Sequence, residues 1–334
     1  MALPSAVRAM LDSSIYPHLV TNLSLLQTQI SFIFLTGSYV YKIKKPVDLA
    51  YLDYTTLAKR EYFCHRELEL NSRLSSDVYL EVVPIVQQNN HISLGGIGDI
   101  IEYAVKMRQL PSDRMMDVLL SKNRVSQEMV KRVAMKLAGF HQQAQTNAEI
   151  TSYGSLNAIL ANTEQNFDQT LTYVGVSLSP EQYRNTRAYT DSFAEQNHEL
   201  FEERKKAGKI RDCHGDLHSA HVCFVEDICI FDCIEFNDRF RYCDVASEIA
   251  FLAMDLDYHH HPHLSNQFVD AYVSAVQDKE LPRLVNFYKC YRAYVRGKVG
   301  SFKLADPLIP QEEKSCILAA ARRYFELAHL YTGI

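Results

Sequence analysis

Residues 214–236 interrupt the helical pattern of the second half of the chain, and they constrain its fold more than any other segment. Val222–Val225 and Ile228–Phe231 are short apolar runs, and only Glu226 and Asp227 stand between them. Two apolar runs joined by two polar residues predict a tight β-hairpin. Any fold for this chain must therefore accommodate a small hairpin within a mostly helical region.

Acidic residues flank this hairpin on both sides. HGDLHSAH precedes it and carries Asp216, and FDCIEF follows it and carries Asp232. Because a hairpin returns the chain to its starting point and these strands are only about 13 Å long, both aspartates are expected at one end of it. Such a pair suits phosphoryl transfer, in which one carboxylate accepts the proton of an attacking hydroxyl and the other holds the Mg²⁺ that neutralises ATP phosphates.

The first 107 residues predict a small antiparallel sheet that carries one helix. Residues 29–45 are rich in β-branched and aromatic side chains on both sides of Gly37 and Ser38, which predicts a hairpin. Apolar residues then recur at helical spacing from about Tyr54 to Arg73, which predicts a helix. Further strands are predicted in VYLEVVPIVQQ, HISL and IIEYAVKM.

The chain from about Pro111 onward is predicted to be mainly helical. Ser179, Pro180 and Gln182 provide an N-cap, a first-turn proline and a capping box for a long helix that closes near Gly208. With no internal repeat and no linker-like tract, residues 1–107 and 108–334 are predicted to be two lobes of one α+β unit. Three apolar stripes at helical spacing predict further helices: Val130, Val133, Leu137 and Phe140; Val245, Ile249, Leu252 and Leu256; Tyr288, Tyr291, Val295, Val299 and Phe302.

Composition excludes several classes of protein. Of 334 residues, 47% are hydrophobic and 22% are charged, and there are only 12 Gly and 10 Pro, so the chain is neither collagen-like nor disordered. The net charge is -5, so the chain lacks the excess positive charge that usually attracts nucleic acid. No early stretch resembles a signal peptide or a membrane span, so we expect a cytoplasmic protein with reduced cysteines that binds neither nucleic acid nor membrane.

HGDLHSAH lies over the kinase catalytic-loop pattern H-R-D-L-x-x-x-N. The segment resembles the protein-kinase-like superfamily, and most closely its aminoglycoside phosphotransferase and choline kinase branch. The resemblance implies a two-lobed protein-kinase-like fold, with Asp216 as the catalytic base and Asp232 as the ligand of Mg²⁺. It also implies that Asp244, in RYCDVASEIA, is a structural residue that braces the catalytic loop.

Two longer segments resemble one part of this branch more narrowly. TGSYVYKIKKPVDLAYLDYTTLAKR and IEFNDRFRYCDVASEIAFLAMDLD look like an uncharacterised bacterial group, some of whose members carry a second, P-loop kinase domain. This chain has no G-x-x-x-x-G-K-[ST] sequence, so that second domain is expected to be absent.

The resemblance extends to the nucleotide-binding half. It implies that one lysine of VYKIKK contacts the ATP phosphates and is held by a glutamate on the following helix, which would be Glu67. Lys42 and Lys44 share one face of a strand, so alternation alone does not choose between them. Lys42 is preferred because VYK resembles the family's strand pattern. IIEYAVKMRQLP would be the hinge between the lobes, with backbone groups near Val105 to Met107 meeting the adenine.

The sequence departs from the family at its metal site. The family's metal-binding asparagine is replaced by His221, five residues after Asp216. Mg²⁺ prefers oxygen ligands, whereas imidazole nitrogen suits transition metals. Three interpretations stay open: one metal site is lost, Mn²⁺ is tolerated better than Mg²⁺, or Glu235 supplies the missing oxygen. The chain also lacks a G-x-G-x-x-G loop, and TGS at 36–38 is the sole candidate for cradling phosphate.

The sequence therefore predicts an enzyme that moves the γ-phosphoryl group of ATP, with GTP as the alternative donor, onto a hydroxyl of a small molecule. The principal alternative is a catalytically silent protein that binds nucleotide or acts as a scaffold, motivated by His221 and the poor glycine loop. A third class, a metal-binding thiol protein, rests on cysteines near the expected site, although they form no C-x₂-C pair. The sequence indicates neither the acceptor nor the oligomeric state.

Overall fold

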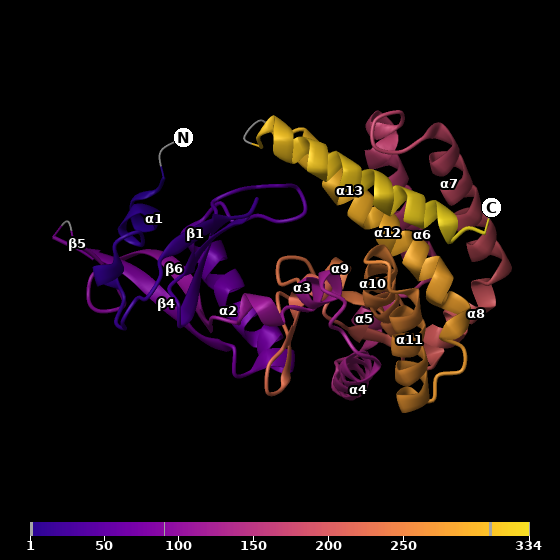
Figure 1. Ribbon diagram of the computed structural model, residues 1–334, viewed down its shortest axis with the longest axis horizontal. Coiled ribbons are helices and arrows are strands. Elements are labelled where there is room, and N and C mark those ends of the chain that lie inside the picture. The colour runs from indigo at the N-terminus through magenta and orange to yellow at the C-terminus, as the bar shows by residue number, and fades with distance from the viewer. Residues whose placement is uncertain (1–2, 90, 307–308, 334) are drawn as a thin grey trace. The chain divides into compact units, whose positions relative to one another are not determined.

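The computed structural model describes residues 3–89, 91–306 and 309–333, which divide into two compact units (Figure 1). The sheet unit combines the first 115 residues with His221–Asp238. The helical unit combines Met116–Ala220 with Arg239–Ile334. The hairpin that follows the catalytic-loop sequence therefore belongs to the same unit as the amino-terminal sheet, although about 105 residues separate them in the chain.

The sheet unit contains a six-stranded antiparallel sheet in the order β1-β2-β3-β6-β4-β5. This confirms the α+β class and the small sheet expected from the sequence. One long helix, α2 (Leu57–Ser75), packs on β4 and β6, and a short helix, α1 (Ser5–Ala9), lies near β5. The strands are β1 (Ser24–Gln27), β2 (Ser31–Leu35), β3 (Tyr39–Lys44), β4 (Tyr79–Gln88), β5 (His91–Leu94) and β6 (Asp99–Arg108).

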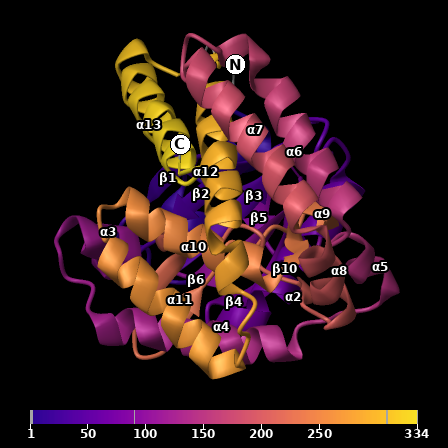
Figure 2. The same ribbon diagram turned by 90° about the vertical axis from the view of Figure 1, so that its right-hand side faces the viewer.

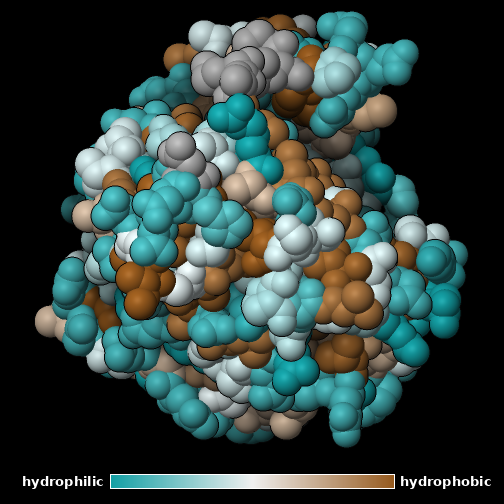
Figure 3. Space-filling view, turned by 90° about the vertical axis from the view of Figure 1, so that its left-hand side faces the viewer, coloured by the Kyte–Doolittle hydropathy of each residue, from teal (hydrophilic) through white to brown (hydrophobic). Residues whose placement is uncertain are grey.

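The predicted hairpin is formed by β2 and β3, with Leu35 opposite Val40. Its turn needs glycine because Gly37 has a positive φ of 94°, and a side chain there would collide with Thr21. β1 pairs with β2 and was not predicted, because SLLQ is short and has no alternating pattern. Figure 3 shows apolar side chains among polar ones on one face of the molecule, as is usual for folded proteins.

α2 begins later than its apolar spacing suggested. The Thr56 side chain accepts a hydrogen bond from the Lys59 amide, so Thr56 is the N-cap and the helix runs from Leu57. The buried face of α2 includes Arg60 and Glu67 as well as apolar residues. Arg60 bonds to Glu102 of β6 at 2.9 Å, which ties the helix to the sheet.

The hairpin after the catalytic-loop sequence is confirmed. β8 (Val222–Phe224) pairs with β9 (Ile228–Ile230), each one residue shorter than predicted. β9 lies against α2, where the Ser75 hydroxyl donates to the carbonyl oxygen of Ile230 at 2.8 Å. This packing fixes the chain that leaves β9, which carries Asp232.

The helical unit is built around α10 (Val245–Tyr258) and α12 (Pro282–Leu304). Figure 2 shows α12 running between α13 and the pair formed by α6 and α7, all of which it contacts. A two-stranded ribbon of β7 (Ile210–Asp212) and β10 (Tyr242–Asp244) precedes α10. The other helices are α3 (Met116–Ser121), α4 (Gln127–Gln143), α5 (Ala148–Ser152), α6 (Leu156–Thr170), α7 (Pro180–Gln196), α8 (His198–Lys206), α9 (Asp238–Arg241), α11 (Pro262–Val276) and α13 (Gln311–Leu330).

The prediction of one long helix from Pro180 to Gly208 is wrong in its second half. The capping box is present, since Ser179 and Gln182 bond to each other's amides, but α7 ends at Gln196 and α8 starts at His198. Asn197 separates the two helices with non-helical angles. No glycine or proline marks this break, so the usual helix-breaking residues did not predict it.

The predicted apolar stripe on α12 is correct at Tyr288 but wrong at its carboxyl-terminal end. Val299 and Phe302 are 40% and 38% exposed. α12 instead turns Gly297 toward α13, where an added Cβ would meet the Phe325 ring at 2.9 Å. A small residue therefore sets this helix contact, which a search for large apolar residues does not detect.

Candidate active site

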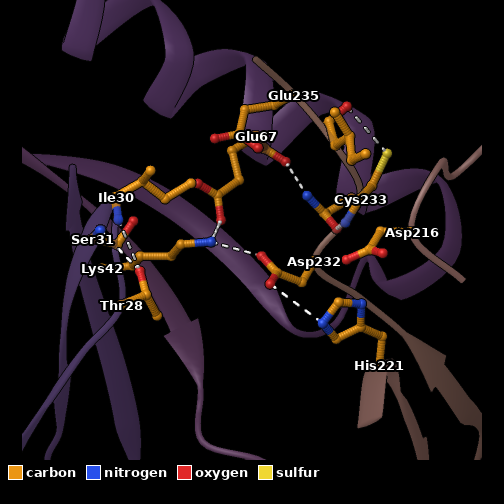
Figure 4. A network of polar contacts seen from close by, with 12 residues as sticks. Thr28, Ile30, Ser31, Lys42, Glu67, Asp216, His221, Asp232, Cys233 and Glu235 are labelled. Atoms are coloured by element: carbon orange, nitrogen blue, oxygen red, sulfur yellow. Dashed lines mark hydrogen bonds and ion pairs between the residues drawn. The ribbon is translucent and has the colours of Figure 1, made fainter. Parts of the chain in front are cut away.

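Three charged residues from three elements of the sheet unit meet on one face of the sheet (Figure 4). Lys42 projects from β3, Glu67 from α2, and Asp232 from the chain after β9. The Lys42 ammonium lies 2.8 Å from Glu67 Oε1 and 2.6 Å from Asp232 Oδ1. The structure thus brings together the lysine, glutamate and metal-binding aspartate that the sequence resemblance implied.

Lys44 lies on the same face of β3, as alternation requires, and it has different partners. Its ammonium bonds to Glu67 Oε2 at 2.8 Å and also pairs with Glu235. The hydroxyl of Tyr54 donates to Glu235 at 2.6 Å. Glu67 therefore bonds one lysine with each oxygen, and Lys42 is the one that also contacts Asp232.

The electrostatics of these groups follow from burial and pairing. Burial alone would lower the pKa of Lys42, but Asp232, Glu67 and Glu235 together raise it well above its normal value. Lys44 behaves in the same way. Burial alone would lower its pKa, but Glu235 and Glu67 raise that pKa well above its normal value. Burial likewise disfavours ionised Glu67, yet the two lysines hold its pKa below normal. All three groups are charged at neutral pH.

Asp232 adopts a backbone conformation that is uncommon for a residue with a side chain, with φ at 63°. Hydrogen bonds hold it there: its amide donates to the Tyr79 hydroxyl at 3.1 Å, and the amide of Cys233 donates to Asn71 at 2.8 Å. The Asp232 side chain is 41% exposed. The loop thus presents one carboxylate to solvent while its backbone is bonded to β4 and α2.

His221 stands immediately before β8 and faces the second oxygen of Asp232 (Figure 4). The distance from His221 Nε2 to Asp232 Oδ2 is 3.5 Å. Two ligands of one tetrahedral or distorted octahedral ion, each about 2.1 Å from it, lie roughly 3.0–3.4 Å apart. At 3.5 Å the two donors lie slightly farther apart than this, and their nitrogen and oxygen atoms are of types that bind divalent cations. Glu235, the other candidate oxygen, is bonded to Lys44 and Tyr54.

The two residues predicted to meet adenine lie within the sheet. Val105 is paired with Lys42 on one side and Val82 on the other, and Met107 is paired with Val40 and Tyr79. Both side chains belong to a buried apolar cluster. The backbone leaves the ladder only after Arg108. The assignment of Val105 and Met107 to nucleotide binding stays a prediction.

In the helical unit, buried carboxylates of α10 hold the catalytic-loop sequence. Glu248 accepts hydrogen bonds from the amides of His214 and Gly215 at 2.8 and 2.7 Å, and Asp255 accepts one from Ser219 at 2.8 Å. Burial opposes the charge of Glu248, but its bonds to His141 and His214 lower its pKa to about 2. These carboxylates were missed in the sequence, where the available signal was acidic residues inside an otherwise apolar helix.

Asp216 is 33% exposed at its side chain and lies 3.6 Å from His218, measured between Oδ2 and Nε2. Asp244, expected to brace the catalytic loop, has other bonding partners. It pairs with Arg204 of α8 at 2.5 Å and caps α10 through the amide of Ala246. Asp244 therefore anchors the start of α10, and Glu248 makes the bonds to the loop.

All eight cysteines are free thiols. In the part of the chain that the structure describes, one group of potential metal donors in the helical unit includes a cysteine: His141, Cys213 and Glu248. Both ring nitrogens of His141 are already bonded, to Tyr272 and to Glu248. This arrangement offers little support for the thiol-metal alternative, because a metal would have to displace these bonds.

No family model matches the chain. Uncharacterized proteins of Mycobacterium tuberculosis and Mycobacterium bovis are 31% identical to it over 274 residues, which cover 82% of this chain and 53% of each relative. The chain thus spans about half the length of the curated relatives it matches. Within the described residues, no helix has the length and hydrophobicity needed to cross a membrane.

Solved structures identify the fold. A choline/ethanolamine kinase family protein from Mesorhizobium loti superimposes with a TM-score of 0.53 at 14% identity, covering 97% of this chain and 98% of that protein. A microcompartment-associated aminopropanol kinase gives 0.53 at 11% identity, with 98% and 97% covered. The chain has the fold of this kinase branch. An ADP-bound aminoglycoside phosphotransferase also matches, at 0.50 and 13% identity over 97% of this chain and 99% of that one. The predicted two-lobed kinase-like fold is confirmed.

Proposed function

We propose that the protein is a phosphotransferase that moves the γ-phosphoryl group of ATP to a hydroxyl of a small molecule. The observation that carries this proposal is the position of Lys42 between Glu67 and Asp232 in a chain with a kinase fold. A kinase needs a fixed cation for the phosphates and a carboxylate for the metal. GTP carries the same triphosphate and would contact the same charged groups, so both ATP and GTP are to be tested as phosphate donors.

Each residue has a distinct role in this proposal. Lys42, restrained by Glu67, binds phosphate oxygens, and Asp232 with His221 holds a divalent cation, Mg²⁺ or Mn²⁺, whose charge stabilises the transferring group. Asp216 orients the acceptor hydroxyl and accepts its proton. Positioning and electrostatic stabilisation supply most of the acceleration, because the loose transition state requires little covalent help from the protein.

The acceptor is proposed only as a class. The solved structures that share the fold are named for choline or ethanolamine, aminopropanol and aminoglycoside, which are small molecules that carry hydroxyl groups. At 11–14% identity this likeness supports the fold and not a particular acceptor. We further propose that the protein works in the cytoplasm, where ATP is present and its eight free thiols stay reduced.

The test is a screen of hydroxyl-bearing metabolites for ATP consumption with Mg²⁺ or Mn²⁺, followed by comparison with Asp216→Asn. The variant should lose at least about 100-fold in turnover, because general-base catalysis contributes that much, and should bind ATP as the wild type does. A variant with wild-type turnover would remove Asp216 from the mechanism.

A catalytically silent nucleotide-binding protein is the second candidate, and His221 at the metal site is the observation that favours it. The two candidates differ in one measurement. A silent protein would bind ATP in the metabolite screen without consuming it for any acceptor, with either metal.

A further inference from the structure

The sheet unit contains a second buried lysine that the phosphate-binding role of Lys42 does not require. Lys44 has a fully buried side chain, and its ammonium contacts the carboxylates of Glu67 and Glu235. The Tyr54 hydroxyl also bonds to Glu235, and the Lys44 ammonium lies 4.9 Å from the centre of the Tyr54 ring. We refer to Lys44, Tyr54 and Glu235 as the latch.

We propose that the latch positions the loop of residues 231–236, so that Asp232 is held at the orientation needed to bind the divalent cation beside Lys42. Lys44, Tyr54 and Glu235 are thus positioning residues of the active site, and Glu235 acts through Lys44 rather than as a metal ligand. This inference rests on the proposed phosphotransferase function for its consequence, but the latch itself is a property of the sheet unit alone.

The bonds of the loop support this role. The amide of Asp232 is bonded to Tyr79 on β4, and the amide of Cys233 to Asn71 on α2. Glu235, three residues after Asp232, adds a bond to β3 through Lys44. The loop is therefore attached to three different elements within four residues, which is the kind of support that keeps an uncommon backbone conformation at Asp232.

Charge explains why the latch acts on Lys42 as well as on the loop. Glu67 divides its two oxygens between Lys42 and Lys44, so each lysine limits the orientation of the carboxylate that holds the other. Glu235 is only 5% exposed, and removal of Lys44 would leave it without its buried cation. Removing one partner of a buried ion pair strongly destabilises the folded protein, because the other charge stays buried without compensation. The loop and the Glu67 carboxylate would therefore both have to rearrange.

The inference also accounts for the presence of two lysines on one face of β3. A buried lysine is costly unless it is paired and hydrogen-bonded. Lys44 pairs with two carboxylates from distant parts of the chain, one on α2 and one on the loop after β9. Its position therefore joins two elements of the proposed active site, which an apolar side chain would not do.

The experiment compares hydrogen exchange of the 231–236 peptide and ATP affinity in the wild type, Lys44→Met and Tyr54→Phe. We expect Lys44→Met to speed exchange of this peptide about tenfold or more and to weaken ATP binding about tenfold in the presence of Mg²⁺. Affinity for ATP without metal should change less than about threefold, because Lys42 remains. Tyr54→Phe removes one hydroxyl and should act in the same direction more weakly. Lys205→Met, which breaks the partly exposed Lys205–Glu202 pair on α8, is the matched control.

A variant with an apolar latch separates positioning from stability. Lys44→Met with Tyr54→Phe and Glu235→Leu removes the buried charges together, so its melting temperature should recover toward that of the wild type. Its loss of the Mg²⁺-dependent part of ATP affinity should persist, whereas a latch that only stabilises the fold would let that affinity recover as well.

The outcomes distinguish this inference from the proposed function. Unchanged exchange of the 231–236 peptide in Lys44→Met would overturn the latch, whatever the protein binds. Faster exchange in a protein that binds no ATP in any form would leave the latch in place and remove the phosphotransferase proposal.

Discussion

At the scale of single residues, His221 distinguishes this site from the kinase pattern that the rest of the sequence follows. An asparagine would offer a carbonyl oxygen, and His221 offers an imidazole nitrogen 3.5 Å from Asp232. Nitrogen donors raise affinity for Mn²⁺ relative to Mg²⁺, which demands oxygen ligands in near-ideal octahedral geometry. The substitution therefore bears on the choice of metal.

We predict that His221→Asn lowers the ratio of Mn²⁺ affinity to Mg²⁺ affinity about tenfold, the size of effect expected for a metal ligand or its close support. The measurement is an isothermal calorimetric titration of each metal into the ATP-bound protein. His91→Asn, at an exposed histidine on β5, serves as the control. An unchanged ratio in His221→Asn would show that the imidazole does not contact the metal.

At the scale of elements, α10 supplies the buried carboxylates that hold the segment with the catalytic-loop sequence. Glu248 sits within this buried helix and accepts bonds from two loop amides and from His141. Its pKa is lowered to about 2 in the folded protein, against an ordinary value of 4.5. A group with a depressed folded pKa contributes stability that is present above its unfolded pKa and is lost as pH falls through its folded pKa.

Glu248 should therefore contribute about 3 kcal/mol above roughly pH 4.5, and this contribution should disappear between about pH 4.5 and pH 2. We predict that Glu248→Gln is less stable than the wild type at neutral pH and that its free energy of unfolding falls less steeply on acidification. Urea unfolding from pH 7 to pH 3 measures both. Parallel pH profiles for the two proteins would contradict the assignment of the lowered pKa to Glu248.

Elements also show why some features could be predicted and others could not. The β8–β9 hairpin and the capping box at Ser179 depend on neighbouring residues, so local pattern found them. The break at Asn197 and the inward turn of Gly297 depend on how helices pack, which no local pattern contains. The roles of Glu248 and Asp255 were hidden for the same reason, since the loop they hold is more than 30 residues away in sequence.

At the scale of the whole molecule, the chain order of the motifs predicted the fold better than composition did. The catalytic-loop sequence implied a kinase fold, and Lys42, Glu67 and Asp232 converge as that fold requires. Strand alternation could not choose between Lys42 and Lys44, because both occupy one face of β3, and the preference for Lys42 rested on the family resemblance of VYK alone. Only the tertiary positions of Glu235 and Asp232 give the two lysines different partners.

Ligand binding provides a test on the intact protein. A ligand that binds only the folded chain stabilises it by about 2.7 kcal/mol at 100 times its dissociation constant, which raises the melting temperature by a few degrees. We predict this rise for the wild type with ATP and Mg²⁺ and for Asp216→Asn, since Asp216 is assigned to proton transfer and not to nucleotide binding. Asp232→Asn should respond equally to ATP with and without Mg²⁺, because Asp232 is the carboxylate assigned to the metal. A metal-dependent rise that survives in Asp232→Asn would move the cation to other residues and leave the contact between Lys42 and Asp232 without its proposed purpose.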